Sequence, residues 1–411
     1  MRWLYTALIS PLVLGILTNG SPVTGGHHGE LEERNETLTL FRRVRTGPNG
    51  ELLDPKTADD LFLIDDGPGG CRAYEDTLNA WVTEAMQLHA AIEELYRNVR
   101  NDRSKILLWK MWFGLDIDMR IRDIDLDDDF NEQIWNTIGD HIGRVSKFLA
   151  GGGLENPDVE GEKPRVFCGA AAGVFQDWAR SVVKDKDGQD VVASEDPETG
   201  EKTYLSLIDA FTGQRISENT RAFWFDSFKG YDFDEKGYDT LCHPAPENGR
   251  KRYAKTAHHS SNWPTIRVSN PEFEFGRANR HILFCPPAFN PDAGFHSYPS
   301  LAEALDDYPV AGLRDPDSAL DRLLPVSATL YHELYHLTDA NNTPDQKYRP
   351  DAIIQEASST NTRVGNSHNP ETFTYVAMAA YLLLRAPAGD EPCLYMSPFP
   401  AKASDPFNQG G

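Results

Sequence analysis

The sequence predicts an α+β fold with a mainly helical core and a small sheet. Two long stretches carry apolar residues at helical spacing, the first over Leu78–Val99 and the second over Ile134–Phe148. Short apolar runs typical of strands also occur, such as Ala222–Phe228 and His281–Cys285. Long helices accompanied by separate short strands are typical of the α+β class.

Composition restricts the class of partner. The chain has 411 residues, of which 40% are hydrophobic, and this content is ample for one large or two small domains. A formal net charge of −23 disfavours nucleic acid and anionic membranes as partners.

The N-terminal residues Met1–Gly20 are typical of a secretory signal peptide, with Arg2 before the apolar stretch Trp3–Leu17. No later stretch has the roughly 18 apolar residues of a spanning helix, so we expect a secreted, extracellular chain without membrane contact after cleavage. Residues 21–70 are rich in glycine, proline and charge, and we expect a loose N-terminal segment or a propeptide there. The basic run that ends at Arg45 is either a processing site or a solvated turn.

Five cysteines fit an oxidising compartment, with two disulfide bonds and one cysteine left over. The sequence does not determine how they pair. Asn35 and Asn341 begin glycosylation sequons, which makes a glycoprotein the expectation, although Pro344 follows the second sequon closely.

The stretch Thr329–Tyr348 carries the candidate chemistry. His332, Glu333 and His336 form the H-E-x-x-H pattern of zinc hydrolases. Four residues of an α-helix advance by roughly 400°, so the two imidazoles project from one face and can share one Zn²⁺ ion. Glu333 lies about 100° further round the helix, where it can reach a water on the metal without binding the metal.

A catalytic zinc ion needs a third protein ligand. A metzincin would carry glycine at position 339 and histidine at 342, but Asp339 and Asn342 stand there and exclude that class. Asp339 is expected to be a capping or supporting residue. The residues leave two candidates open: Asp345, after the turn that ends the helix, and Glu356, on a predicted helix over 350–359.

The run Thr343–Tyr348 resembles the G-T-x-D-x-x-Y-G signature of the aspzincins, which are deuterolysin-like zinc endopeptidases mostly secreted by fungi. The resemblance implies that His332, His336 and Asp345 bind the zinc ion. It also implies that Glu333 is the general base and that Tyr348 stabilises the tetrahedral intermediate. Asn342 and Arg349 depart from the signature, because both replace glycines.

Three other segments resemble the same family. Trp112–Gly114 is similar to its Y-F-G element, and His281–Cys285 is similar to a strand that we expect at the sheet edge facing the substrate. Asn366–Tyr375 occupies the place of an N-A-D-x-x-E-Y-F-A segment whose two acids bind a substrate lysine. Glu371 matches the first acid and is expected to bind substrate, but Thr374 replaces the second, so strict lysine specificity is not expected.

The resemblance implies a zincin-like metallopeptidase, with an active-site helix carrying H-E-x-x-H and a small sheet with a substrate-facing edge strand. We expect a catalytic domain over residues 71–385 with an irregular, strand-containing insertion around 151–280. Residues 386–411 are expected to form an irregular tail.

The predicted function is that of a secreted zinc metalloendopeptidase acting on protein or peptide substrates. Two alternatives stay open. One is a gluzincin-type peptidase that uses Glu356 as third ligand. The other is a catalytically degraded binding or effector protein on the same scaffold, which Arg349, the missing acidic pair and the sequon at Asn341 favour.

Overall fold

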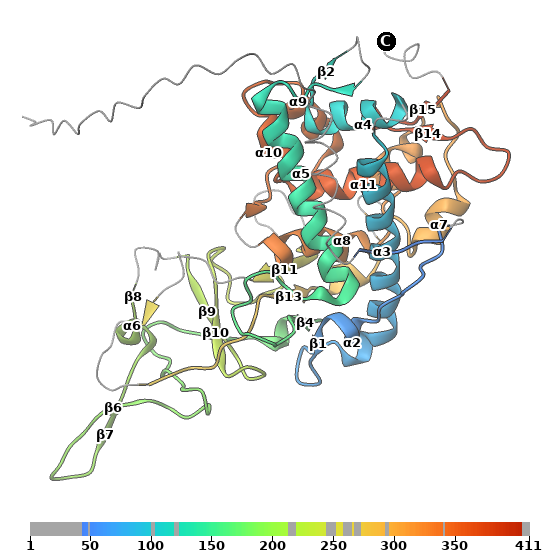
Figure 1. Ribbon diagram of the computed structural model, residues 1–411. Coiled ribbons are helices and arrows are strands. Elements are labelled where there is room, and N and C mark those ends of the chain that lie inside the picture. The colour runs from blue at the N-terminus through green and yellow to red at the C-terminus, as the bar shows by residue number, and fades with distance from the viewer. Residues whose placement is uncertain are drawn as a thin grey trace, which may run out of the picture. The chain divides into compact units, whose positions relative to one another are not determined.

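The computed structural model describes residues 43–47, 50–99, 103–118, 123–212, 219–243, 252–257, 265–266, 273–291, 296–339 and 342–404. The predicted signal peptide, Met1–Gly20, and both sequon asparagines lie outside these residues. The described chain is of the predicted α+β class, with helices and several small sheets (Figure 1).

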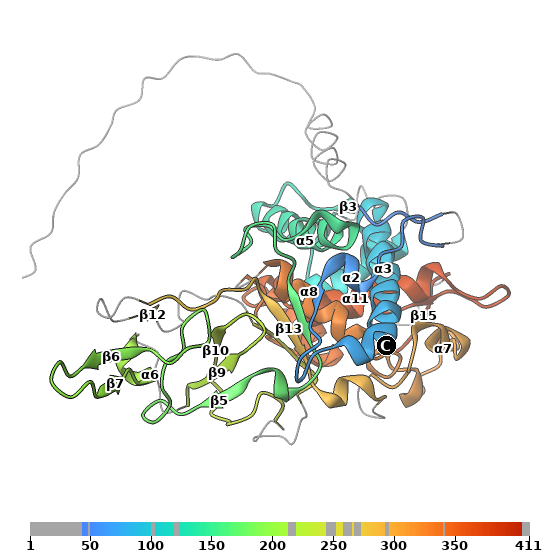
Figure 2. The same ribbon diagram turned by 90° about the horizontal axis from the view of Figure 1, so that it is seen from below.

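Four helices pack against one another and form the helical core: α3 (Glu75–Arg97), α5 (Asp129–Lys147), α8 (Ala328–Asp339) and α11 (Pro370–Leu384). The periodic stretches predicted as helices coincide with α3 and α5. α11 is buried on all sides, and it contacts both α3 and α8 (Figure 2). Burial of its side chains stabilises the core, since apolar area removed from water contributes about 25 cal/mol per Å². The aromatic ring of Tyr335 on α8 stacks on Phe373 of α11 at 4.5 Å.

The main sheet has four strands in the order β1 (Leu63–Ile64), β4 (Arg165–Phe167), β13 (His281–Phe284) and β11 (Ala254–Ala257). β1, β4 and β13 are parallel, and β11 is antiparallel to β13. The prediction that His281–Cys285 forms the sheet edge is therefore wrong, because β13 is paired on both sides. Within the described residues the edge strands are β1 and β11, and β11 contacts α8.

The segment before Cys71 is more ordered than predicted. Residues 58–61 form helix α2 (Ala58–Leu61), whose N-terminus is capped by Thr57, and β1 follows in the main sheet. The prediction of a loose segment over 21–70 thus fails for these residues. Pairing of β1 with a strand some 100 residues later is a non-local interaction that local composition does not reveal.

The predicted insertion around 151–280 is also more regular than expected. It contributes β4 and β11 to the main sheet, and the described residues of 174–243 form what we call the β-rich module. Its three-stranded sheet has the order β10 (Gly230–Asp234), β9 (Arg221–Phe225) and β5 (Val174–Gln176). A separate apolar core stabilises the module, with buried residues that include Val183, Leu207, Phe211, Trp224 and Phe233.

The remaining elements are short. They are α4 (Arg103–Phe113), β2 (Ile117–Asp118), β3 (Asp123–Ile124), β6 (Val192–Glu195), β7 (Lys202–Tyr204), α6 (Leu207–Ala210), β8 (Phe211–Thr212), β12 (Thr265–Ile266), α7 (Leu301–Asp306), α9 (Pro350–Ala357), α10 (Arg363–Asn366), β14 (Cys393–Leu394) and β15 (Ala401–Lys402). The antiparallel pair β14–β15 corrects the prediction of a wholly irregular tail over 386–411. None of the described helices combines the length and apolarity needed to cross a bilayer.

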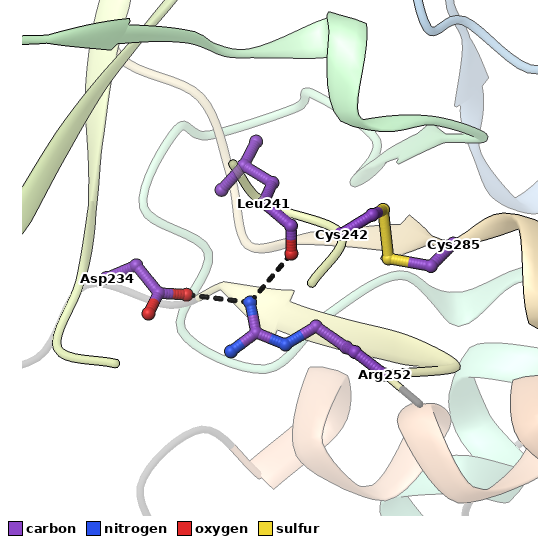
Figure 3. Close-up of a disulfide and its surroundings, with 5 residues drawn as sticks. All are labelled: Asp234, Leu241, Cys242, Arg252 and Cys285. Carbon is purple, nitrogen blue, oxygen red and sulfur yellow. Dashed lines mark hydrogen bonds and ion pairs between the residues drawn. A yellow bond between two sulfur atoms is a disulfide. The ribbon is translucent and has the colours of Figure 1, made fainter. Parts of the chain in front are cut away.

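Two disulfide bonds and one free cysteine confirm the predicted count. Cys71 pairs with Cys168, and Cys242 pairs with Cys285, while Cys393 is a buried free thiol. The first bond links the start of α3 to the end of β4, and the second links the β-rich module to the end of β13 (Figure 3).

Replacing Cys71 and Cys168 by alanine is expected to lower the free energy of unfolding by about 3–5 kcal/mol, because the bond closes a loop of 97 residues. Denaturant titration measures the change. Cys393→Ala is the matched control, and it should cost only about 1–2 kcal/mol since it removes a buried thiol but no cross-link. Equal losses in both variants would contradict the assigned pairing.

Candidate metal centre

Helix α8 presents two histidines on one face. Its opposite side is buried through Leu330, Leu334 and Leu337, and this burial fixes the rotation of the helix. His332 Nε2 and His336 Nε2 lie 3.2 Å apart, so the i and i+4 spacing brings the imidazoles together as predicted.

Asp345 completes the group after the chain turns back towards α8. Its Oδ1 atom lies 3.1 Å from His332 Nε2 and 3.0 Å from His336 Nε2. The three side chains form a possible metal-binding group in which all ligand atoms lie within 4.8 Å of one another. Glu356, the alternative third ligand, is not part of this group among the described residues.

The N-terminal end of α11 holds the loop that carries Asp345. Asn369 Nδ2 donates to the carbonyl oxygen of Lys347 at 2.9 Å, and the Tyr375 hydroxyl donates to that of Tyr348 at 3.0 Å. Thr343 Oγ1 also bonds to the carbonyl oxygen of Tyr335 on α8. These side-chain bonds to the backbone fix the path of the loop, and sequence reasoning did not find them.

Glu371 occupies a different position from the one predicted. It is buried, with 2% of its surface exposed, and its Oε2 atom lies 2.8 Å from His332 Nδ1. The prediction that Glu371 binds substrate does not match this burial. A carboxylate that accepts the second ring N–H of a metal-binding histidine orients the ring and raises its basicity.

The charges of the group fit a bound cation. Burial lowers the pKa of His332, but hydrogen bonds to Asp345 and Glu371 outweigh it and hold the pKa well above its usual value. Burial raises the pKa of Asp345, yet the two histidines hold it well below its usual range. The second oxygen of Glu371 is buried and has no hydrogen-bond partner in the described chain. Two carboxylates beside two imidazoles therefore leave negative charge that a divalent ion can neutralise.

Glu333 follows His332 directly on α8, and its side chain contacts strand β11. The side chain is buried, and its Oε2 atom accepts a hydrogen bond from Thr256 Oγ1 at 2.5 Å. Among the described residues, Glu333 is not part of the possible metal-binding group.

The Tyr348 ring lies beside the ligand group. It lies face to face with the His332 ring at 6.4 Å, and 41% of the residue is exposed. Removal of water from the hydroxyl, together with the Asp345 charge, raises the pKa of Tyr348 above its usual value. The phenol is therefore a hydrogen-bond donor at neutral pH.

Asp339 supports the end of α8, one turn beyond His336. It is buried and accepts hydrogen bonds from His141 and Arg144 of α5. Burial lowers the pKa of His141 to about 3, so the ring is neutral. The expectation that Asp339 supports the site rather than binding the metal agrees with these contacts.

Comparison with known proteins gives little guidance. No protein-family model matches the chain, and no solved structure matches it. A stretch of 146 residues, 35% of this chain, is 49% identical to a Penicillium expansum protein named "Non-secreted LysM effector LysM17". The chain spans about a fifth of that relative, since the match covers 19% of it.

We predict that Asp345→Ala empties the metal site and that Glu356→Ala does not, because only Asp345 reaches both imidazoles. Zinc per mole of protein after dialysis is the measurement. Each variant removes one carboxylate, so each is the control for the other. Full zinc content in Asp345→Ala with loss in Glu356→Ala would reverse the assignment.

Glu371→Gln is expected to weaken zinc binding about 10–100-fold, since the neutral amide is a poorer acceptor for the His332 ring N–H. Competition with a chelator of known affinity measures the change. Glu94→Gln on α3 is a control, because this partly exposed carboxylate contacts only Arg385 among the ion pairs of the described residues. Unchanged affinity in Glu371→Gln would contradict an orienting role.

Proposed function

We propose that the protein is a zinc metalloendopeptidase of zincin-like architecture, similar to the aspzincins. The observation that carries the proposal is the convergence of His332 Nε2, His336 Nε2 and Asp345 Oδ1, with Glu333 beside them. Two nitrogens and one carboxylate oxygen suit zinc, and three protein ligands leave a fourth position open, as in catalytic zinc sites.

A bound zinc ion would supply Lewis acidity, which lowers the pKa of a water towards about 7 and polarises a carbonyl group. Glu333 accepts the proton of the attacking water and returns it to the leaving amine of the cleaved peptide bond. The Tyr348 hydroxyl donates to the carbonyl oxygen as negative charge develops there, a contact worth about 3–4 kcal/mol.

Protein or peptide segments in extended form are the proposed substrates. β11 is an antiparallel strand at the sheet edge, and it lies against α8, so a substrate backbone added along it would pass the metal group. Glu371 does not contribute to side-chain recognition in this proposal, because it is buried against His332. A preference for lysine has no support among the described residues of the site.

Secretion is part of the proposal, and it is supported by the signal-like N-terminus and the two disulfide bonds. The relative from Penicillium expansum carries the name of a non-secreted effector. This name favours the second candidate function, an effector on the same scaffold that does not cleave peptides.

Glu333→Gln should keep zinc and lose at least about 100-fold in the rate of casein cleavage, because an amide cannot accept the proton. Removing zinc from the unchanged protein with a chelator should abolish cleavage, and adding zinc back should restore it. Fluorescent casein hydrolysis with parallel zinc analysis measures both effects. A zinc-loaded, folded protein that cleaves neither casein nor a peptide library would favour the effector.

A further inference from the structure

A hydroxyl group on strand β11 lies against the side chain proposed as the base. Thr256 Oγ1 donates to Glu333 Oε2 at 2.5 Å and lies 3.3 Å from the Glu333 carbonyl oxygen. A separation of about 2.5–2.7 Å is typical of a hydroxyl that donates to an ionised carboxylate, which is a strong hydrogen bond. Thr256 therefore restrains the carboxylate of Glu333 from the neighbouring strand.

The opposite face of β11 is fixed to the β-rich module. Successive side chains of a strand point to opposite faces, so Lys255 points away from α8. Lys255 Nζ lies 2.8 Å from Asp232 Oδ2 and 3.5 Å from Asp234 Oδ2, and both aspartates are buried on β10. One face of β11 thus forms ion pairs with the β-rich module, and the other face donates a hydrogen bond to Glu333.

Two further contacts restrain the chain that leads into β11. Arg252 donates to Asp234 Oδ2 at 2.8 Å and to the carbonyl oxygen of Leu241 at 2.9 Å (Figure 3). The adjacent disulfide between Cys242 and Cys285 closes a loop of 43 residues that contains β11. Because these contacts restrain the backbone, the Thr256 hydroxyl has a defined position relative to α8.

We propose that Thr256 is a positioning residue that holds the Glu333 carboxylate in the orientation required for proton transfer. The inference rests on the proposed function, because it gives Glu333 the role of base. Thr256 acts through Glu333 and is not a member of the metal-binding group. A base must lie within hydrogen-bond reach of its proton, so loss of the restraint lowers the rate of the chemical step rather than substrate affinity.

Thr256→Val keeps the shape of the side chain and removes the donor. We expect kcat to fall about 10–100-fold, since small misplacement of a catalytic group has effects of this size, while KM changes by less than about 2-fold. Thr256→Ser should restore kcat to within about 3-fold of the unchanged protein, because it returns the hydroxyl. Thr203→Val, at an exposed threonine on β7, is the matched control and should leave kcat and zinc content unchanged.

A loss of kcat that Thr256→Ser fails to restore would overturn the proposal. So would a normal kcat in Thr256→Val. Zinc analysis of each variant separates misplacement of Glu333 from loss of the metal. Among the described residues, Thr256 bonds to Glu333, and the hydrogen bonds of the metal-binding group do not include Thr256.

A second measurement does not depend on activity. Crystal structures of the zinc-loaded Thr256→Val and Thr256→Ser variants report the position of the Glu333 carboxylate directly. We expect a displaced or doubled Glu333 side chain in Thr256→Val and a single one, bonded to the hydroxyl, in Thr256→Ser. A single, unmoved Glu333 in Thr256→Val would refute the positioning role. If the unchanged protein cleaves no peptide, the proposed function fails, and these structures still decide the role of Thr256.

Discussion

The site depends on one reversal of the chain, which returns Asp345 to the two imidazoles of α8. A helix supplies His332 and His336 by its own geometry, but no local rule returns a carboxylate from nine residues further on. That return is fixed by side chains at the start of α11, which bond to the backbone of the loop. Because α11 is buried on all sides, the loop is supported by a closely packed helix of the core.

Buried charge explains why the same region is organised for a cation. Glu371 contacts the Nδ1 atom of His332 and Asp345 contacts its Nε2 atom, so the ring lies between two carboxylates. Glu371 is buried, and burying a carboxylate without compensation costs several kcal/mol. The His332 ring, whose pKa is raised, compensates in part by holding a proton, and a divalent ion would compensate more completely while leaving this ring neutral.

The parts of the fold that follow from local periodicity could be predicted from the sequence, and the parts that follow from distant pairing could not. α3 and α5 carry enough apolar residues at helical spacing to be recognised. β11 has the sequence Ala-Lys-Thr-Ala, which lacks an apolar pattern, and it is a strand because it pairs with β13. His332, Glu333 and His336 could be found from spacing alone, whereas the choice of Asp345 over Glu356 rested on a family resemblance. Glu371 lies in the first turn of α11, where acidic residues are common because they interact with the helix dipole. Local sequence therefore did not predict its contact with His332.

The position of β11 changes the meaning of the stretch that sequence reasoning treated as an insertion. A four-residue strand without an apolar pattern has little intrinsic stability, and its place at the sheet edge leaves one side of its backbone without a strand partner among the described residues. The ion pairs of Lys255 and Arg252 with the β-rich module, together with the disulfide at Cys242, supply the restraint that the sheet alone does not. Since the opposite face of this strand carries Thr256 against Glu333, the module contributes to the geometry of the candidate site. The stretch predicted as an insertion around 151–280 therefore supports strand β11 beside the metal-binding group.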